Sequence, residues 1–277
     1  MKALSYNAFT LKIIAVVAMI LNHIAIGLQP VLPFGLYAVF FAVGGATYVI
    51  MAFFVVEGYR HTSNLKKYIG RLLIFGLIAQ AFHPTVLGST AMIDGPIFLN
   101  IMFTITLSLL ILLAYDKIKI RFLFWLLFVV ACVISMFMDL IFMAVLGTLL
   151  YHIIKKESRR RTLPGIITGI FYIVIGLFGV FGASSVQTLK SAGMYEEAAY
   201  LIEQLGGYQM VEMLWVTPTF AIGAFLGAIL IRNFNGERGL RAKWLFYVAY
   251  PLHLAIIAAI MVALGISAFN LFGFITL

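Results

Sequence analysis

The stretch LKIIAVVAMILNHIAIGL, which runs from Leu11 to Leu28, decides the fold class of this chain. It holds one charged residue, Lys12, and its length falls within the roughly 17–25 residues that an α-helix needs to cross a bilayer. Comparable apolar stretches recur at approximately 13–29, 36–57, 69–87, 98–115, 121–136, 138–154, 164–182, 213–232 and 244–268. The sequence therefore predicts an all-α fold, a polytopic membrane helix bundle with about nine transmembrane helices.

The composition excludes soluble domains and outer-membrane barrels. Of the 277 residues, 64% are hydrophobic and 10% are charged, whereas a soluble domain carries about 25% charged residues. A barrel would need short stretches of alternating hydrophobicity, which this sequence lacks. The net charge of +9 is spread over short loops, which is typical of topology control and not of nucleic-acid binding. The single cysteine, Cys132, excludes an intramolecular disulfide and argues against a cysteine-rich metal site.

The basic residues predict the orientation in the membrane. With a cytoplasmic N-terminus and nine helices, only Lys190 of the 19 Lys and Arg residues falls outside, as the positive-inside rule requires. We interpret the N-terminus as a retained signal anchor in the cytoplasmic (inner) membrane and residues 1–277 as a single domain. The external loop at about 183–212 alternates glutamates with apolar residues, which predicts an amphipathic helix on the outer surface. A solvated lid and a docking surface are the alternatives for this loop.

Lys12 and His23 lie on one face of the first predicted helix. Eleven residues of α-helix give about 16 Å of rise and about 1100° of turn, so the two side chains point within roughly 20° of each other. His23 is then about halfway across a hydrocarbon layer ~30 Å thick, where a polar side chain is costly and often functional. The alternatives are a core histidine bonded to a neighbouring carbonyl and an interfacial lysine anchor.

A second cluster of charges lies at the predicted cytoplasmic ends of the second and third helices. Glu57 and Arg60 are spaced for an i,i+3 pair, and Lys67 and Arg71 share a helix face at i,i+4. Surplus cations at such a mouth are suited to hold phosphate groups through charge-assisted hydrogen bonds. The alternative is a topology determinant with a solvated face.

Further polar residues fall within apolar segments. They are Gln80, His83, Asn100, Thr104 and Asp139. Asp139 is either an exposed residue of the hairpin near 135–139 or a carboxylate that faces the bundle and pairs with an imidazole. In the last segment, Tyr247, Tyr250 and His253 are spaced by three and share one side of a helix, with His253 well inside the span.

Four stretches carry a resemblance to a known family. They are LKIIAVVAMILNHI from Leu11 to Ile24, EGYRHTSNLKKYIGRLL from Glu57 to Leu73, NIMFTITLSLL from Asn100 to Leu110, and NGERGLRAKWLFYVAYPLHL from Asn235 to Leu254. In this order they resemble the TraX family of membrane proteins, whose founding role is the N-terminal acetylation of conjugative pilin. The spacing of Lys12 and His23 also resembles the pattern of a basic residue, a ten-residue gap and a histidine in the larger acyltransferase-3 group.

The resemblance implies a site and a reaction. It implies that His23 is a catalytic base or acyl carrier and that acetyl-CoA is the acyl donor. It also implies that four cations receive the phosphates of CoA, namely Lys12, Arg60, Lys67 and Arg71. Three further residues are candidates for stabilising an oxyanion, namely Asn100, Tyr250 and His253. TraX-like sequences usually have Asp where this chain has Asn22, and this departure bears on activity and on the choice of acceptor.

The leading hypothesis is a membrane-bound acetyltransferase that moves an acetyl group from cytoplasmic acetyl-CoA to an amine or hydroxyl. The acceptor is a pilin-like N-terminus, another peptide, a glycan or a lipid headgroup. A proton-coupled transporter with a path through His23, Asp139 and His253 is the first alternative. A non-catalytic assembly partner of a conjugation or surface system is the second. Small-residue spacings at Gly165–Gly169 and Gly223–Gly227 predict close helix packing and not a site.

Overall fold

The computed structural model describes residues 5–87, 98–205, 208–267, 270–271 and 275–276. Its helices are α1 (Ala8–Gly27), η1 (Gln29–Val31), α2 (Phe34–His61), α3 (Leu65–Gln80), α4 (His83–Leu87), α5 (Ile101–Lys117), α6 (Arg121–Ile134), η2 (Ser135–Phe137), α7 (Ile141–Ile153), α8 (Glu157–Ser191), α9 (Tyr195–Gln204), α10 (Tyr208–Val216), η3 (Thr217–Thr219), α11 (Phe220–Arg232) and α12 (Lys243–Ala263). Two short strands, β1 (Asn270–Leu271) and β2 (Ile275–Thr276), pair antiparallel. The all-α membrane bundle is confirmed.

Asparagine side chains define the starts of three of these helices. Asn7, Asn64 and Asn100 each accept a hydrogen bond from a backbone amide in the first turn, at 2.9, 2.9 and 3.1 Å respectively. Such caps satisfy amides that the helix itself leaves without a partner. Each cap therefore fixes where α1, α3 or α5 begins, and the apolar sequence that follows extends the helix.

The predicted number of nine transmembrane helices is not established. Each of the nine predicted segments contains helix, but only five helical stretches among the described residues are long and apolar enough to cross a membrane. These are Ala8–Gly27, Phe34–His61, Glu157–Ser191, Val211–Arg232 and Lys243–Ala263. The other helices are shorter, with 16 residues in α3 and 17 in α5. The turn predicted near 135–139 does separate α6 from α7.

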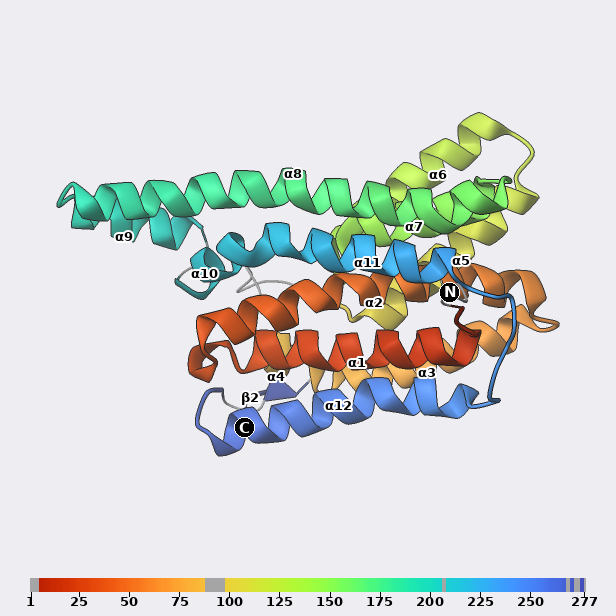
Figure 1. Cartoon of the computed structure of the whole chain (residues 1–277), viewed down its shortest axis with the longest axis horizontal. Helices are drawn as coiled ribbons and strands as arrows, with labels where there is room; N and C mark the ends of the chain where they lie inside the picture. Colours follow the sequence, from red (N-terminus) through yellow and green to blue (C-terminus); the bar gives the residue numbers. More distant parts are fainter. Residues whose placement is uncertain (1–4, 88–97, 206–207, 268–269, 272–274, 277) are drawn as a thin grey trace.

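The helices pack in an order that places α1, the first long helix, beside α12, the last one. In Figure 1, α1 lies between α2 and α12, and α11 lies between α2 and α8. A side-chain carbon at Gly223 of α11 would meet the carbonyl oxygen of Ala42 in α2, so these two backbones touch. Gly165 and Gly169 of α8 also lie close to α11, where an added side-chain carbon would meet the side chains of Ala228 and Phe225. The predicted role of these glycines in close packing is confirmed.

The predicted cytoplasmic segments gather at one end of the bundle. The amide of Tyr6 bonds to the carbonyl of Asn233 at 3.0 Å, and the Arg60 guanidinium donates to the carbonyl of His152 at 2.9 Å. The Arg161 guanidinium, at the start of α8, donates to the carbonyl of Phe234. We call this end, formed by residues 5–12, 57–71, 115–121, 152–162 and 232–243, the basic end.

The region predicted as an external loop differs from the prediction at its start. Helix α8 continues to Ser191, past the predicted end of the span at 182, and α9 folds back beside it (Figure 1). Helix α9 is amphipathic, because Ala198 and Ile202 are buried while Tyr195 is exposed. The apolar face packs on α8. Residues 206–207 and 268, which belong to predicted segments, lie outside the described residues.

Candidate functional site

A cavity of about 480 Å³ lies inside the bundle, and we call it the central cavity. Along α1 its wall runs from Ala15 to Ile26, which is about 16 Å of helix. Phe246 of α12 lines the part nearest the basic end, and Tyr172 and Phe220 line the opposite part. Most of the wall is apolar. The polar residues on the wall include Asn22 and His23 of α1, Asp139 before α7 and Tyr250 of α12.

His23 and His253 meet at the wall of the central cavity. The Nε2 atom of His253 lies 3.2 Å from Nδ1 of His23, although 230 residues separate them in sequence. Both side chains are buried, at 8% and 5% exposure. The Tyr250 ring completes the group, with its centroid 6.3 Å from that of His23 and 5.5 Å from that of His253. Three of the predicted site residues are therefore brought together.

The hydrogen bonds of the two rings define which nitrogen of His23 keeps a free lone pair. The Nδ1 atom of His253 lies 2.8 Å from the carbonyl of Ala249, so a neutral His253 must carry its proton there. Its Nε2 is then an acceptor, which requires the proton of a neutral His23 on Nδ1, where the Met19 carbonyl also accepts at 2.9 Å. The lone pair of His23 is left on Nε2. Among the described residues nothing bonds to this Nε2, and His23 lines the central cavity.

The Tyr250 hydroxyl is a second unused group at the same wall. Tyr250 is 1% exposed, and no described residue accepts a hydrogen bond from its hydroxyl. A buried hydroxyl that lacks an acceptor costs free energy, so this donor is available to a ligand in the cavity. Tyr250 therefore has the geometry expected of an oxyanion donor, next to a base.

Asn100 lies away from the central cavity. Its Nδ2 atom donates to the carbonyl of Gly76 and to Oε1 of Gln80, both at 2.8 Å, while its Oδ1 caps α5. The Gln80 side chain also accepts from the Asn100 backbone amide at 3.0 Å. All polar atoms of this side chain are thus used to join α3 to α5. A direct contact of Asn100 with an oxyanion stays a prediction, and the structure gives the side chain a positioning role.

Asp139 faces the bundle and pairs with a buried histidine. Its Oδ2 lies 3.1 Å from Nε2 of His83 and accepts from the amide of Ile101 at 3.0 Å. Of the two predicted possibilities for Asp139, the one that faces the bundle is confirmed. The sequence offered both residues as buried polar groups but did not pair them, since the pair depends on how α4, α5 and the turn before α7 meet. Leu140, next in sequence, has a left-handed backbone with φ 63°, which is costly for a branched residue.

The four predicted phosphate-binding cations do not lie together. The Lys12 ammonium lies 4.8 Å from the centroid of Phe54 and 5.7 Å from that of Phe246, beside the Phe246 end of the central cavity, which we take as its mouth. Arg71 lies beside the same part of α12, with Nε 3.4 Å from the hydroxyl of Tyr247. Among the described residues, neither cation has an acidic partner.

Arg60 and Lys67 have other surroundings. Arg60 donates to the carbonyl of His152 at the end of α7 and lies 3.9 Å from Glu57, so its charge is already engaged. Lys67 is exposed in the first turn of α3. Contact of either residue with a phosphate stays a prediction, and of the four only Lys12 and Arg71 flank the mouth of the cavity.

Comparison with known proteins gives the family of this chain. The sequence pattern of the family described as TraX protein matches residues 8–261. The chain belongs to the TraX family. It is 26% identical over 279 residues to "Probable fimbrial assembly protein FimC, serogroup H1" of Dichelobacter nodosus, covering 92% of this chain and 96% of that protein. No solved structure matches the chain.

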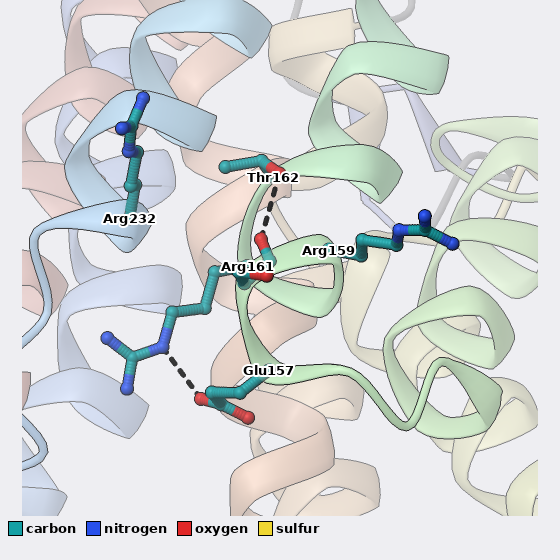
Figure 2. A pocket seen from close by; sticks show the side chains of 6 residues that line it. Glu157, Arg159, Arg161, Thr162 and Arg232 are labelled. Carbon is teal, nitrogen blue, oxygen red and sulfur yellow. Dashed lines mark hydrogen bonds and ion pairs between the residues drawn. The ribbon is translucent and has the colours of Figure 1, made fainter.

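This TraX protein has a second pocket, between α8 and α11 at the basic end, and we call it the second basic pocket because arginines line it. It measures about 580 Å³ and is lined by Glu157, Ser158, Arg159, Arg161, Thr162 and Arg232. Figure 2 shows that the Arg161 guanidinium turns to Glu157, while Arg159 and Arg232 point in different directions. The arginines therefore do not converge on one point, as a phosphate site would need.

Asn22 stands where the resemblance to TraX-like sequences predicts an aspartate. Its side chain packs against Gly44 of α2, and its Nδ2 atom has no hydrogen-bond partner among the described residues. The residue lines the central cavity next to His23 but on a different face of α1. An aspartate there would add a negative charge to the wall, whereas asparagine adds none.

Proposed function

We propose that this TraX protein is a membrane acyltransferase that moves an acetyl group from cytoplasmic acetyl-CoA to an amine or hydroxyl acceptor. One observation carries the proposal: a free imidazole nitrogen, Nε2 of His23, faces a cavity whose mouth carries the unpaired cations Lys12 and Arg71. A base at the middle of a bundle serves chemistry only if a substrate can reach it, and the central cavity provides that path.

The donor fits the residues that surround the path. The phosphates of CoA require cations without acidic partners, and Lys12 and Arg71 have this property among the described residues. The pantetheine arm is narrow and extended, which suits a largely apolar cavity that follows α1 for about 16 Å. The acetyl thioester would then lie beside His23 and Tyr250 while the nucleotide stays at the basic end.

The two free groups at the wall supply the chemistry that acyl transfer needs. His23 Nε2 takes a proton from the acceptor as the acceptor nitrogen or oxygen forms its bond to the acetyl carbon. The Tyr250 hydroxyl donates to the oxygen that becomes negative in the transition state. As the carbon–sulfur bond breaks, the imidazolium returns the proton to the sulfur. His253 holds the tautomer of His23 through its Nε2 contact and does not touch the reacting atoms.

The relatives favour a pilin-like acceptor within this proposal. One relative along nearly the whole chain is named as a fimbrial assembly protein, and the family's founding role is the acetylation of pilin. The chain is then a pilin-associated membrane enzyme. To test this, purified protein in lipid nanodiscs would be given acetyl-CoA and a peptide with a free N-terminus. Release of CoA with acetylation of the peptide supports the proposal; solute flux in proteoliposomes without such release would support a transporter instead.

The two cations at the mouth give a separate prediction. Replacing Lys12 or Arg71 by glutamine should raise the KM for acetyl-CoA by about tenfold each, because a charge-assisted contact to phosphate is lost. The kcat should change little, since neither side chain reaches the reacting atoms. Steady-state kinetics of CoA release measure both constants. Lys66→Gln, an exposed lysine at the same end, is the matched control; an equal effect of the control would contradict the assignment.

A further inference from the structure

Asp139 presents a free carboxylate oxygen to the central cavity. Among the described residues, the side chain has two polar contacts, with His83 Nε2 at 3.1 Å and with the Ile101 amide at 3.0 Å, and Oδ2 makes both. Among the described residues no donor contacts Oδ1. The side chain is 14% exposed and lines the cavity. A carboxylate inside a membrane protein is costly, so an oxygen without a donor indicates a missing partner.

The surroundings of Asp139 hold this oxygen in a fixed place. The backbone amide of Asp139 donates to the carbonyl of Leu99 at 3.0 Å, and its carbonyl accepts from the Thr104 hydroxyl at 3.1 Å. With the two contacts on Oδ2, four interactions orient the residue and none uses Oδ1. A side chain that binds a ligand in one defined geometry is usually held in place by such supporting contacts.

The free oxygen lies close to the proposed reaction centre. Asp139, His23 and Tyr250 all line the central cavity. A ligand bound to Oδ1 would therefore be placed beside the base and the oxyanion donor. The remaining wall near Asp139 is apolar, with Leu140 and Ile141 next to it, so it offers little to solvate a charged ligand.

We propose that Asp139 selects the acceptor, by binding the ammonium group of a primary amine through Oδ1. This inference rests on the proposed acyl transfer. An ammonium group matches a carboxylate in charge and offers three donors, whereas a neutral hydroxyl or water gains only an ordinary hydrogen bond. The bound ammonium first releases one proton to bulk solvent, and the resulting neutral amine attacks the acetyl carbon. As the new carbon–nitrogen bond forms, His23 takes the second proton and passes it to the departing sulfur, so ammonium and thioester become amide, thiol and one proton.

The test compares two acceptors that differ only in the reacting group. One is a short peptide with a free N-terminal amine, and the other is the same peptide with a hydroxyl in place of that amine. We expect the nanodisc-embedded protein to acetylate the amine peptide at least tenfold faster. Asp139→Asn should reduce this preference by about tenfold or more, because the amide keeps the shape but not the charge. Mass spectrometry of both peptides, together with CoA release, gives the ratio of the two acetylation rates.

Asp116→Asn provides a matched control. Asp116 is also paired with a histidine, His152, at 2.9 Å, but it lies at the basic end away from the central cavity. We expect this variant to keep the preference of the wild-type protein. Equal rates on the two peptides with the wild-type protein would overturn the inference, even if Asp139→Asn failed to fold. An unchanged preference in a folded Asp139→Asn variant would overturn it too. If the wild-type protein releases no CoA with any acceptor, the proposed function itself fails.

Discussion

Replacement of His23 by glutamine is expected to slow acetyl transfer by about 10²–10⁴-fold. Glutamine is similar in size and can still form hydrogen bonds, but it cannot accept a proton from the acceptor. The structure leaves the Nε2 lone pair of His23 facing the central cavity, so the loss should appear in kcat more than in the KM for acetyl-CoA. Initial rates of CoA release, measured at a saturating concentration of the amine peptide and at varied acetyl-CoA, give kcat and this KM.

His61→Gln is the control for this result. His61 is exposed at the basic end and contacts only its own helix, at the carbonyl of Glu57. Its replacement should leave the rate near that of the wild-type protein. A His23→Gln variant that transfers acetyl groups within a few-fold of the wild-type rate would remove His23 from the reaction.

Replacement of Gly223 by valine is expected to cause the largest loss of stability. A side-chain carbon at this position would meet the carbonyl oxygen of Ala42 and the amide of Ala46, both backbone atoms that cannot rotate away. The α2–α11 contact would have to open, at a cost of about 3 kcal/mol or more. The apparent unfolding temperature in detergent, followed by tryptophan fluorescence, should fall sharply or the protein should aggregate.

Gly70→Ala is the matched glycine control. A side-chain carbon at Gly70 would meet no atom within 4 Å, and the residue lies inside α3. Alanine should therefore leave the fold unchanged or stabilise it by about 0.5–1 kcal/mol, because glycine loses more freedom in a helix. A Gly223→Val variant as stable as the Gly70→Ala variant would contradict the close contact of α2 with α11.

Local patterns predicted the elements but not the partners of the polar residues. The spacing of Lys12 and His23 placed both on one side of α1, and the structure puts both at the central cavity. The contact of His23 with His253 depends on α1 packing against α12, which no local pattern specifies. Asp139 and His83 also meet only because distant segments pack together. Polarity within an apolar segment marked these residues, and tertiary packing decided what they touch.

The same limit explains where the predicted site was too broad. Asn100 is a polar residue within an apolar segment, and Arg60 belongs to a cluster of charges at a predicted helix end, which made both of them candidates. In the structure Asn100 joins α3 to α5, and Arg60 binds carbonyls at the end of α7. Both form hydrogen bonds with backbone groups, including those at helix ends that the helix itself leaves without a partner. The count of spans was uncertain for a related reason, since several apolar helices are shorter than a full crossing.

The central claim is that the donor occupies the central cavity between Lys12 and His23, and cysteine protection tests it directly. In a Cys132→Ala background, Met51→Cys would place a thiol on the cavity wall and Ser158→Cys would place one in the second basic pocket. We predict that acetyl-CoA slows the alkylation of the Met51→Cys variant by iodoacetamide about tenfold or more. The alkylation rate of the Ser158→Cys variant should be the same with and without acetyl-CoA. Equal alkylation of the Met51→Cys variant with and without acetyl-CoA, or protection confined to Ser158→Cys, would contradict the account.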